Sequence, residues 1–288
     1  MSTSVGIQNA NRIVRNAYAS AAYKPTNAGE LWPIAERKSA FFRERDLQLL
    51  PMLQNLDLLP PATIVLGRVR DGNPVLLSLG LSPVGHLLVT GPHNSGKSEL
   101  IRSALVSLCL TSRQAQVCIL GVDIGGHELA VLDAMPHALT DLATEPRYAR
   151  ALFIWLEEER QRRAAYRIQR PAICLVLDDL AWLDRPARKA EAHLLTGLIE
   201  NGAASGIHVI AASLDPLPVR FHALLDRSNV AHATTFNHRT GAFMLKCGEE
   251  SIQASAAWSS ARDLNTVAAL VGAGWMVSRR YLSRSDGD

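Results

Sequence analysis

The sequence has no long apolar run and few cysteines, and both absences narrow the class of protein. No stretch approaches the roughly 18 apolar residues that cross a bilayer. The start, MSTSVGIQNANRIVRN, lacks the charged and then apolar segments of a signal peptide. We therefore expect a cytoplasmic protein with no direct insertion into a membrane. The four cysteines form no C-x-x-C pair, and Cys118 and Cys174 lie within apolar runs, so buried, reduced thiols are expected.

Histidine pairs with metal-ligand spacing and a strong net charge are also absent. The nine histidines include no H-x-x-x-H pair, so they predict no metal site. The net charge of +3 over 288 residues is too small to indicate nucleic-acid binding by itself, although a local basic patch would suffice. Charged residues make up 20% of the chain, which is ordinary for a globular protein. The length fits one large α/β domain, or one domain with an appendage.

The first 60 residues differ from the remainder of the chain. They carry two charged stretches with helix-like spacing, and the segment LLPPAT, with Pro60 and Pro61, marks a boundary after them. We expect residues 1–60 to form a helical N-terminal appendage with a role in packing or oligomerisation. Residues 61–288 are expected to form the second domain.

From Thr63 onward the pattern alternates between strands and helices. The segment TIVLGRVRDGNPVLLSL predicts a β-hairpin whose turn is formed by residues 71–73. Continuous apolar strands are then interleaved with helical stretches, which predicts a mainly parallel sheet flanked by helices. A long helix is expected over residues 145–167, and its Arg- and Glu-rich half is interpreted as a solvated face rather than a DNA contact. The expected strands cover residues 86–90, 117–123, 172–178 and 207–213.

The segment GPHNSGKS matches the phosphate-loop pattern G-x-x-x-x-G-K-[ST] at every fixed position and stands between a predicted strand and a predicted helix. Glycines let such a loop turn its N–H groups inward, and the helix N-terminus adds a partial positive charge. Lys97 is expected to reach the β- and γ-phosphates, and the Ser98 hydroxyl to ligate Mg²⁺. The predicted nucleotide-binding residues are Gly91, Pro92, His93, Asn94, Ser95, Gly96, Lys97 and Ser98.

Two acidic residues follow the apolar strand of the segment AICLVLDDL. A phosphate-loop nucleotidase needs a carboxylate at the end of a buried neighbouring strand to orient the magnesium, and Asp178 occupies such a place. Asp179 is then positioned to polarise the attacking water, which makes it a predicted catalytic residue together with Lys97. The alternative is an Asp pair that caps the next element.

These motifs resemble, in order, those of the motor domain of the FtsK/SpoIIIE branch of the FtsK–HerA ATPases. The similarity extends over residues 63–281 and includes HLLVTGPHNSGKSELIRSAL, LVLDDLAWL, GAASGIHVIAAS and a closing hairpin, GAGWMVSRRY. The resemblance implies a RecA-like P-loop NTPase fold, ATP and Mg²⁺ as cofactors, and a homo-oligomeric ring of six subunits. It also implies movement on double-stranded DNA or export of a protein. A protein partner would supply membrane attachment or substrate.

Three departures from the family pattern favour slow hydrolysis. Asp179 stands where translocases usually have Glu, which retracts the carboxylate by about 1.5 Å, one C–C bond. Leu214 replaces the usual polar residue after the strand HVIAAS, leaving Asp215 or Ser213 as substitutes. The segment GVDIGGHE lacks a Lys that DNA-translocating members often have, and so is closer to the degenerate ATPase modules of type VII secretion. The alternative function is therefore a weakly or non-hydrolysing nucleotide-binding module of a secretion or conjugation-type assembly.

Several arginines and a lysine are candidates for contacts with DNA or with a neighbouring subunit. The segment DRPARK is interpreted as a plain solvated loop, and the alternative is that it faces the pore of a ring and touches DNA phosphates. Arginines after the last predicted core strand are candidates to act in trans on a neighbouring site. The first group comprises Arg185, Arg188 and Lys189, and the second comprises Arg220, Arg227 and Arg239.

Overall fold

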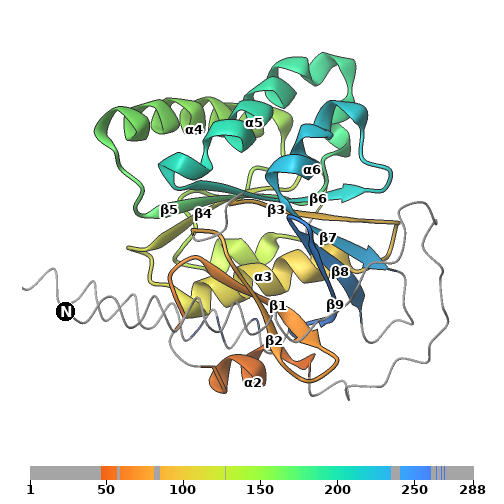
Figure 1. Ribbon diagram of the computed structural model, residues 1–288. Helices are drawn as coiled ribbons and strands as arrows, with labels where there is room; N and C mark the ends of the chain where they lie inside the picture. The colour runs from red at the N-terminus through yellow and green to blue at the C-terminus, as the bar shows by residue number, and fades with distance from the viewer. Residues whose placement is uncertain are drawn as a thin grey trace, which may run out of the picture.

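The computed structural model describes residues 47–56, 59–80, 85–126, 128–234 and 241–260, with 264, 267 and 269. These residues form a nine-stranded sheet in the order β2-β1-β9-β8-β7-β3-β6-β5-β4, flanked by helices (Figure 1). Helices cover both faces of its parallel half. The predicted α/β architecture, with parallel strands flanked by helices, is confirmed.

Five neighbouring strands of the sheet run parallel. Their apolar residues are buried because helices lie on both sides, as continuous apolar runs require. The four strands predicted from the sequence are present within about one residue of the expected bounds, and β7 adds a fifth. These strands are β3 (Leu87–Gly91), β4 (Val117–Val122), β5 (Ala172–Leu177), β6 (Ile207–Leu214) and β7 (Asn229–Thr234).

β6 lies between β3 and β5, so the strand that leads into the phosphate loop and the strand that ends before Asp178 are not direct neighbours. All three strands are parallel, and their carboxyl ends meet at one edge of the sheet. This topology brings residues 91, 178 and 214 to the same edge. In open α/β sheets this edge is where ligands bind.

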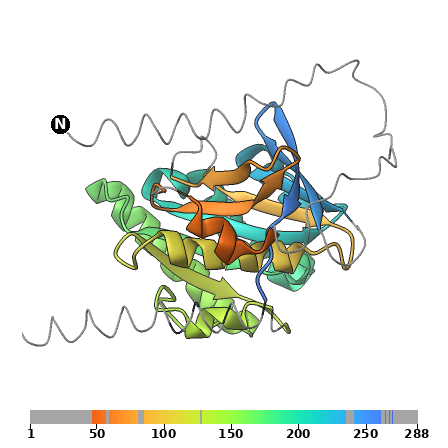
Figure 2. The same cartoon turned by 90° about the horizontal axis from the view of Figure 1, so that it is seen from below.

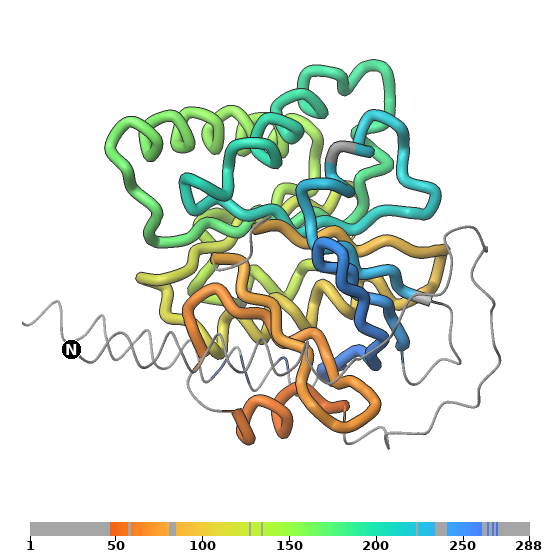
Figure 3. Tube along the Cα trace, in the orientation of Figure 1, coloured from red at the N-terminus to blue at the C-terminus, as the bar shows by residue number. Residues whose placement is uncertain are grey.

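The other half of the sheet is antiparallel. β1 and β2 form the predicted hairpin, and Asn73 N donates to Asp71 Oδ1 at 3.1 Å within its turn. β8 and β9 form a second hairpin, with Gly248 at φ +63° in its turn, that the sequence analysis did not identify. β9 pairs with β1, so the two hairpins lie side by side, as the chain trace in Figure 3 shows. The strands are β1 (Thr63–Val69), β2 (Pro74–Ser78), β8 (Ala242–Cys247) and β9 (Glu250–Ala256).

The helices divide between the two faces of the parallel strands. α4 (Pro146–Tyr166), α5 (Lys189–Asn201) and α6 (Ala223–Arg227) cover one face, and α3 (Lys97–Thr111) covers the other (Figure 1). The long helix expected over 145–167 is α4, confirmed to within one residue at each end. Single-turn 3₁₀ helices occupy Ala130–Ala134, Ala181–Asp184, Pro186–Arg188, Ala203–Ser205 and Val219–Phe221.

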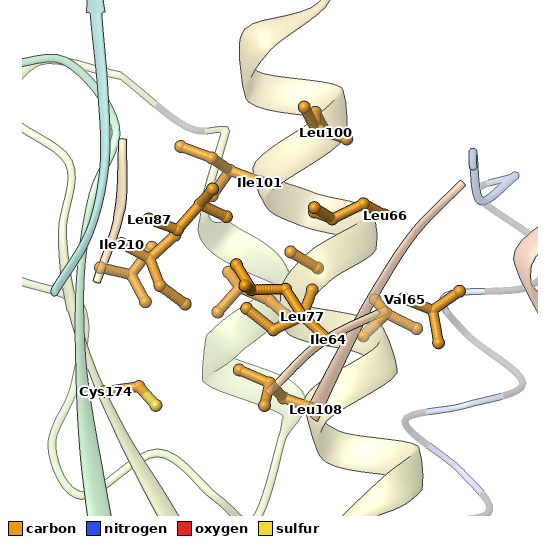
Figure 4. Packing of buried hydrophobic residues seen from close by; sticks show 14 of the residues in the cluster. Ile64, Val65, Leu66, Leu77, Leu87, Leu100, Ile101, Leu108, Cys174 and Ile210 are labelled. Carbon is orange, nitrogen blue, oxygen red and sulfur yellow. The ribbon is translucent and has the colours of Figure 1, made fainter. Parts of the chain in front are cut away.

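α3 is enclosed between the parallel strands and the β1–β2 hairpin (Figure 2). Leu100, Ile101 and Leu108 of this helix pack among residues of both (Figure 4). The hydroxyl group of Ser107 in α3 also contacts β1 directly, because its Oγ accepts a hydrogen bond from Val65 N at 3.0 Å. The same hydroxyl donates to Ala104 O within the helix at 2.7 Å. The helix that begins with the phosphate loop is therefore fixed on two sides.

The short helix α2 (Leu49–Gln54) packs on the same core through Leu49 and Met52. Leu49 N donates to Trp258 O at 2.9 Å, and Trp258 N donates to Leu47 O at 3.0 Å. Residues 1–46 of the expected appendage and the expected closing hairpin, 272–281, lie outside the described residues. The division of the chain at residue 60 stays a prediction.

Two expectations from composition are tested by this fold. Cys118 and Cys174 are buried and free, as predicted. Within the described ranges no helix combines the length and the apolar character that crossing a membrane requires.

Candidate nucleotide site

The phosphate loop, residues 91–98, joins the end of β3 to the start of α3. Gly91 passes so close to β7 that a Cβ atom there would lie 2.4 Å from Ala233 O, and no larger residue fits without movement. Gly96, the residue before α3, has φ +87°, and Asn94 has φ +58°. These left-handed residues curl the loop back over the helix N-terminus, where the first-turn N–H groups have no partner within the helix.

Lys97 closes the loop on itself. Its Nζ donates to Gly91 O at 3.1 Å and to Pro92 O at 2.7 Å. Partial burial lowers the pKa of Lys97, and the nearby carboxylates of Asp179 and Asp178 counteract this by favouring the charged form. The amino group thus lies over the loop, within the field of the two acidic residues.

Ser98 and Asp178 are in direct contact although 80 residues separate them, because Ser98 Oγ donates to Asp178 Oδ2 at 3.1 Å. Burial raises the pKa of Asp178 to about 6, the hydrogen bond from Ser98 opposes this, and the negative charges of Asp123, Glu128 and Asp179 add to the rise. The surroundings of Asp178 thus do not compensate the negative charge of its carboxylate, and a bound cation would do so. A hydroxyl and a carboxylate oxygen suit Mg²⁺, which prefers oxygen ligands.

The donor set fits a metal that arrives with phosphate groups rather than one held by protein alone. The described part of the chain holds no group of three His, Cys, Asp or Glu side chains that would bind a metal ion unaided. Magnesium is usually bound through one or two protein ligands together with substrate phosphates and water. The Oγ of Ser95, buried within the loop, finds no hydrogen-bond partner among the described residues, which also fits an incoming oxygen ligand.

Asp179 differs in its surroundings from Asp178. It is exposed and has φ +88°, a left-handed conformation that Asp tolerates better than most residues. Its Oδ1 accepts a hydrogen bond from Ala181 N at 2.8 Å, at the start of the 3₁₀ helix that follows β5. The carboxylate is therefore bonded to the backbone two residues farther on, as in an Asx turn, and both its role toward water and the alternative of an Asp pair that caps the next element stay predictions.

The end of β6 approaches the phosphate loop through its backbone. Asp215 N donates to Gly91 O at 3.3 Å, while Leu214, in the place of the usual polar residue, is half-buried. Ser213 Oγ donates to Leu214 O at 3.2 Å, so its hydroxyl is engaged locally. Of the two suggested substitutes, Asp215 is the one bonded to the loop.

The Gly-Gly segment after β4 wraps around Asp123. This buried carboxylate accepts from Leu129 N at 3.1 Å, and a Cβ on Gly126 would lie 2.2 Å from Asp123 Oδ1. Glu128, in the same segment, pairs with Arg102 of α3. A larger residue in place of Gly126 would therefore require the Asp123 carboxylate to move.

The basic candidates fall into paired and exposed groups. Arg220 pairs with Asp184 at 2.9 Å and Arg188 pairs with Glu191 at 3.2 Å. These two guanidinium groups are engaged within the chain. Arg239 lies outside the described residues, and the remaining candidates, Arg185, Lys189 and Arg227, are exposed.

Two polar residues near the loop were missed by sequence reasoning. Thr90 Oγ1 and His232 Nδ1 form a hydrogen bond of 3.1 Å between β3 and β7, across 142 residues of sequence. A polar residue at the last position of an apolar strand was the available signal for Thr90. His232 gave none, because β7 was not predicted.

Comparisons with known proteins agree with this geometry. Residues 57–171 match the model of the FtsK/SpoIIIE family. The DNA translocase FtsK of Tropheryma whipplei is 29% identical over 183 residues, which are 54% of this chain and 24% of that protein. The chain thus spans about a quarter of the length of this curated relative.

Solved structures with the same fold include two secretion or conjugation proteins. The cytoplasmic domain of the type VII secretion ATPase EccC of Thermomonospora curvata has a TM-score of 0.60 at 18% identity, over 80% of this chain and 33% of that one. The pCW3 conjugation coupling protein TcpA, in its monomer form with ATPγS, has a TM-score of 0.58 at 18% identity, over 73% of this chain and 71% of that one. At these identities the structures show the fold alone. They confirm the predicted likeness in fold to P-loop ATPases, type VII secretion ATPases included, and the family model confirms the resemblance to FtsK/SpoIIIE over residues 57–171.

Proposed function

We propose that this chain, whose residues 57–171 match the FtsK/SpoIIIE family model, binds Mg·ATP at the phosphate loop and hydrolyses it as a motor that moves double-stranded DNA through a ring of subunits. The observation that carries the nucleotide part is the contact of 3.1 Å between Ser98 Oγ and Asp178 Oδ2, with Lys97 beside it. A hydroxyl, a carboxylate and an ammonium group converge at a helix N-terminus. That combination suits a metal-bound polyphosphate.

The residues of the candidate site have separate roles in this proposal. The loop N–H groups and Lys97 hold the β- and γ-phosphates, and Ser98 and Asp178 hold the metal. Bound there, Mg²⁺ would neutralise charge that develops on the phosphate oxygens. Asp179 orients the attacking water, and an exposed arginine of a neighbouring subunit, Arg227 among the described candidates, supplies charge in trans.

A second candidate function is favoured by the surroundings of Asp179. Its Oδ1 is bonded to Ala181 N at 2.8 Å, which draws the carboxylate toward the protein backbone. Leu214 also offers no polar group toward a γ-phosphate. A module with this site would bind nucleotide and turn it over weakly, and ATP would then stabilise an assembly for secretion or conjugation. A related variant is a motor that works only with a partner protein.

The deciding experiment measures ATP turnover of the purified chain with and without long duplex DNA, with Lys97→Ala as the blank. Turnover above the blank that rises with DNA supports the motor, and the stimulation should fall steeply with salt because phosphate contacts release counterions. Turnover equal to the blank, with ATP still bound, supports the nucleotide-binding module. Stimulation only by another protein supports the partner-dependent motor.

Binding itself is tested separately from turnover. Mg·ATP at a hundredfold over its Kd stabilises a protein that binds it only in the folded state by about 2.7 kcal/mol. We expect this rise in the wild type and its loss in Lys97→Ala, whose own unfolding without nucleotide provides the baseline. An unchanged wild-type melting temperature at saturating Mg·ATP would refute the nucleotide site.

A further inference from the structure

Three polar side chains gather behind the first residue of the phosphate loop. Thr90 Oγ1 lies 3.1 Å from His232 Nδ1, and His232 Nδ1 lies 3.9 Å from Asp215 Oδ2. The three residues come from β3, from β7 and from the segment after β6. The side chains of His232 and Asp215 are 42% and 51% exposed, whereas Thr90 is buried, so the group extends from the edge of the core to solvent.

The cluster lies on the face of the sheet opposite to α3. Thr90 is in register with His232 on β7 and with Ser213 on β6, so these side chains share a face. Side chains alternate along a strand. Val89 packs with the α3 side and Leu88 packs with the α4–α5 side, which places Thr90 on the latter. His232 therefore lies on the face of the sheet that α3 does not cover.

The cluster contacts the phosphate loop through a hydrogen bond to the carbonyl oxygen of Gly91. This oxygen accepts from Asp215 N at 3.3 Å and from Lys97 Nζ at 3.1 Å. Asp215 holds it from the β6 side, and the Thr90–His232 contact holds the preceding residue from the β7 side. If Lys97 turns to a phosphate oxygen, the Gly91 carbonyl keeps only its bond to Asp215.

We propose that His232 is a positioning residue of the nucleotide site, which through its Nδ1 holds Thr90 and Asp215 and so fixes Gly91 for phosphate binding. This inference rests on the proposed function of the phosphate loop. Leu214, at the end of β6, offers no polar side chain to the site. In this proposal His232 of β7 supplies a polar side chain instead. With the ring proton on Nδ1, the ring donates to Thr90 Oγ1 and lies 3.9 Å from Asp215 Oδ2. That distance is too long for a hydrogen bond, but the positive end of the N–H group still attracts the carboxylate away from the incoming phosphates, whose negative charge it would repel.

The position of the donor on the ring makes the proposal testable with matched variants. An Asn side chain places its amide where Nδ1 stands, whereas a Gln side chain places it nearer the position of Nε2. His232→Leu keeps the bulk and removes the donor. The three variants therefore separate loss of the Nδ1 contact from loss of ring packing.

The experiment measures the Kd of Mg·ATP by calorimetry for the wild type, the three variants and Lys97→Ala, with the melting temperature of each in the absence of nucleotide. One lost positioning hydrogen bond is worth about 1 kcal/mol, so His232→Leu should weaken binding about fivefold. His232→Asn should recover most of the affinity, and His232→Gln should not. The effects of His232→Leu and Asp215→Ala should be less than additive, because the two residues act together.

Two results would overturn the inference while leaving the proposed function intact. One is a His232→Leu variant that binds as the wild type does while Lys97→Ala fails to bind. The other is equal weakening by the Asn and Leu variants, which would assign the effect to ring packing. Wild-type protein that binds no better than Lys97→Ala would overturn the proposed nucleotide site and the role of His232 together.

Discussion

The guanidinium group of Arg163 donates a hydrogen bond of 2.8 Å to the carbonyl oxygen of Pro171, joining the last turn of α4 to the start of β5. The same group donates to Ser205 O at 3.2 Å and pairs with Glu159 at 2.7 Å. Its side chain is 3% exposed. One buried cation thus ties a helix, a strand and the segment before β6 together, behind the two strands that end at the candidate site.

Replacing Arg163 by Met should destabilise the fold by about 3 kcal/mol, because it leaves the half-buried Pro171 and buried Ser205 carbonyl groups without this donor. Arg162→Met is the matched control, since Arg162 pairs with the same Glu159 but is 52% exposed. Denaturant unfolding of both variants measures the difference. Equal stability of the two would show that the buried contacts contribute nothing beyond the surface pair.

Asp179→Asn should separate the structural and chemical roles of this residue. Asn accepts the Ala181 N–H and tolerates the positive φ, so its unfolding free energy should stay close to that of the wild type. Turnover should fall at least about tenfold if the carboxylate acts on water. Asp179→Ala should lose both turnover and about 1 kcal/mol of stability. Unchanged turnover in the Asn variant would contradict the catalytic assignment.

Asp179→Glu tests whether the short carboxylate limits the rate. A Glu side chain reaches farther but gives up the contact with Ala181 N and adopts a positive φ less readily. We expect a lower melting temperature together with higher turnover. Turnover below that of the wild type would show that the site is built around Asp.

The two loop glycines should respond differently to alanine. A Cβ at Gly91 would lie 2.4 Å from Ala233 O, whereas a Cβ at Gly96 meets no atom within 4 Å. Gly96→Ala should therefore cost only backbone strain, about 1–2 kcal/mol, and Gly91→Ala should cost more. Thermal unfolding of both variants without nucleotide checks the order, and a reversed order would contradict the close approach of β7.

Acid should destabilise the fold through a buried histidine pair. Burial and the neighbouring His208 lower the pKa of His86 from 6.5 to about 4. The unfolded chain then binds more protons than the folded one between these values, so the stability is fully present above pH 6.5 and is lost as the pH falls toward 4. Over this range the contribution of His86 amounts to roughly 3 kcal/mol.

His86→Asn provides the check on this acid dependence. Its side-chain oxygen accepts the Val209 N–H that His86 Nδ1 accepts at 2.9 Å in the wild type. The slope of unfolding free energy against pH below 6.5 should become shallower, whatever the effect on stability at neutral pH. The same slope in both proteins would assign the acid sensitivity to other groups.

The sequence patterns predicted those features that a single contiguous segment determines. The apolar runs before Gly91 and Asp178 define buried strands by themselves, and the phosphate loop is contiguous, so its conformation follows from its glycines. The β8–β9 hairpin was missed because its strands lie at a half-exposed antiparallel region, where residues such as Lys246 and Gln253 interrupt the apolar pattern. Contacts such as Thr90 with His232 depend on the strand order, which no short segment contains.

The placement of β6 has a mechanical consequence. Neighbouring strands stand about 4.8 Å apart, so the backbones of β3 and β5 are separated by about twice that distance, yet Ser98 Oγ and Asp178 Oδ2 approach to 3.1 Å. The first turn of α3 spans the width of β6 to make this contact. The contact between hydroxyl and carboxylate therefore depends on the position of β6 as well as on the two residues that make it, although no side chain of β6 takes part.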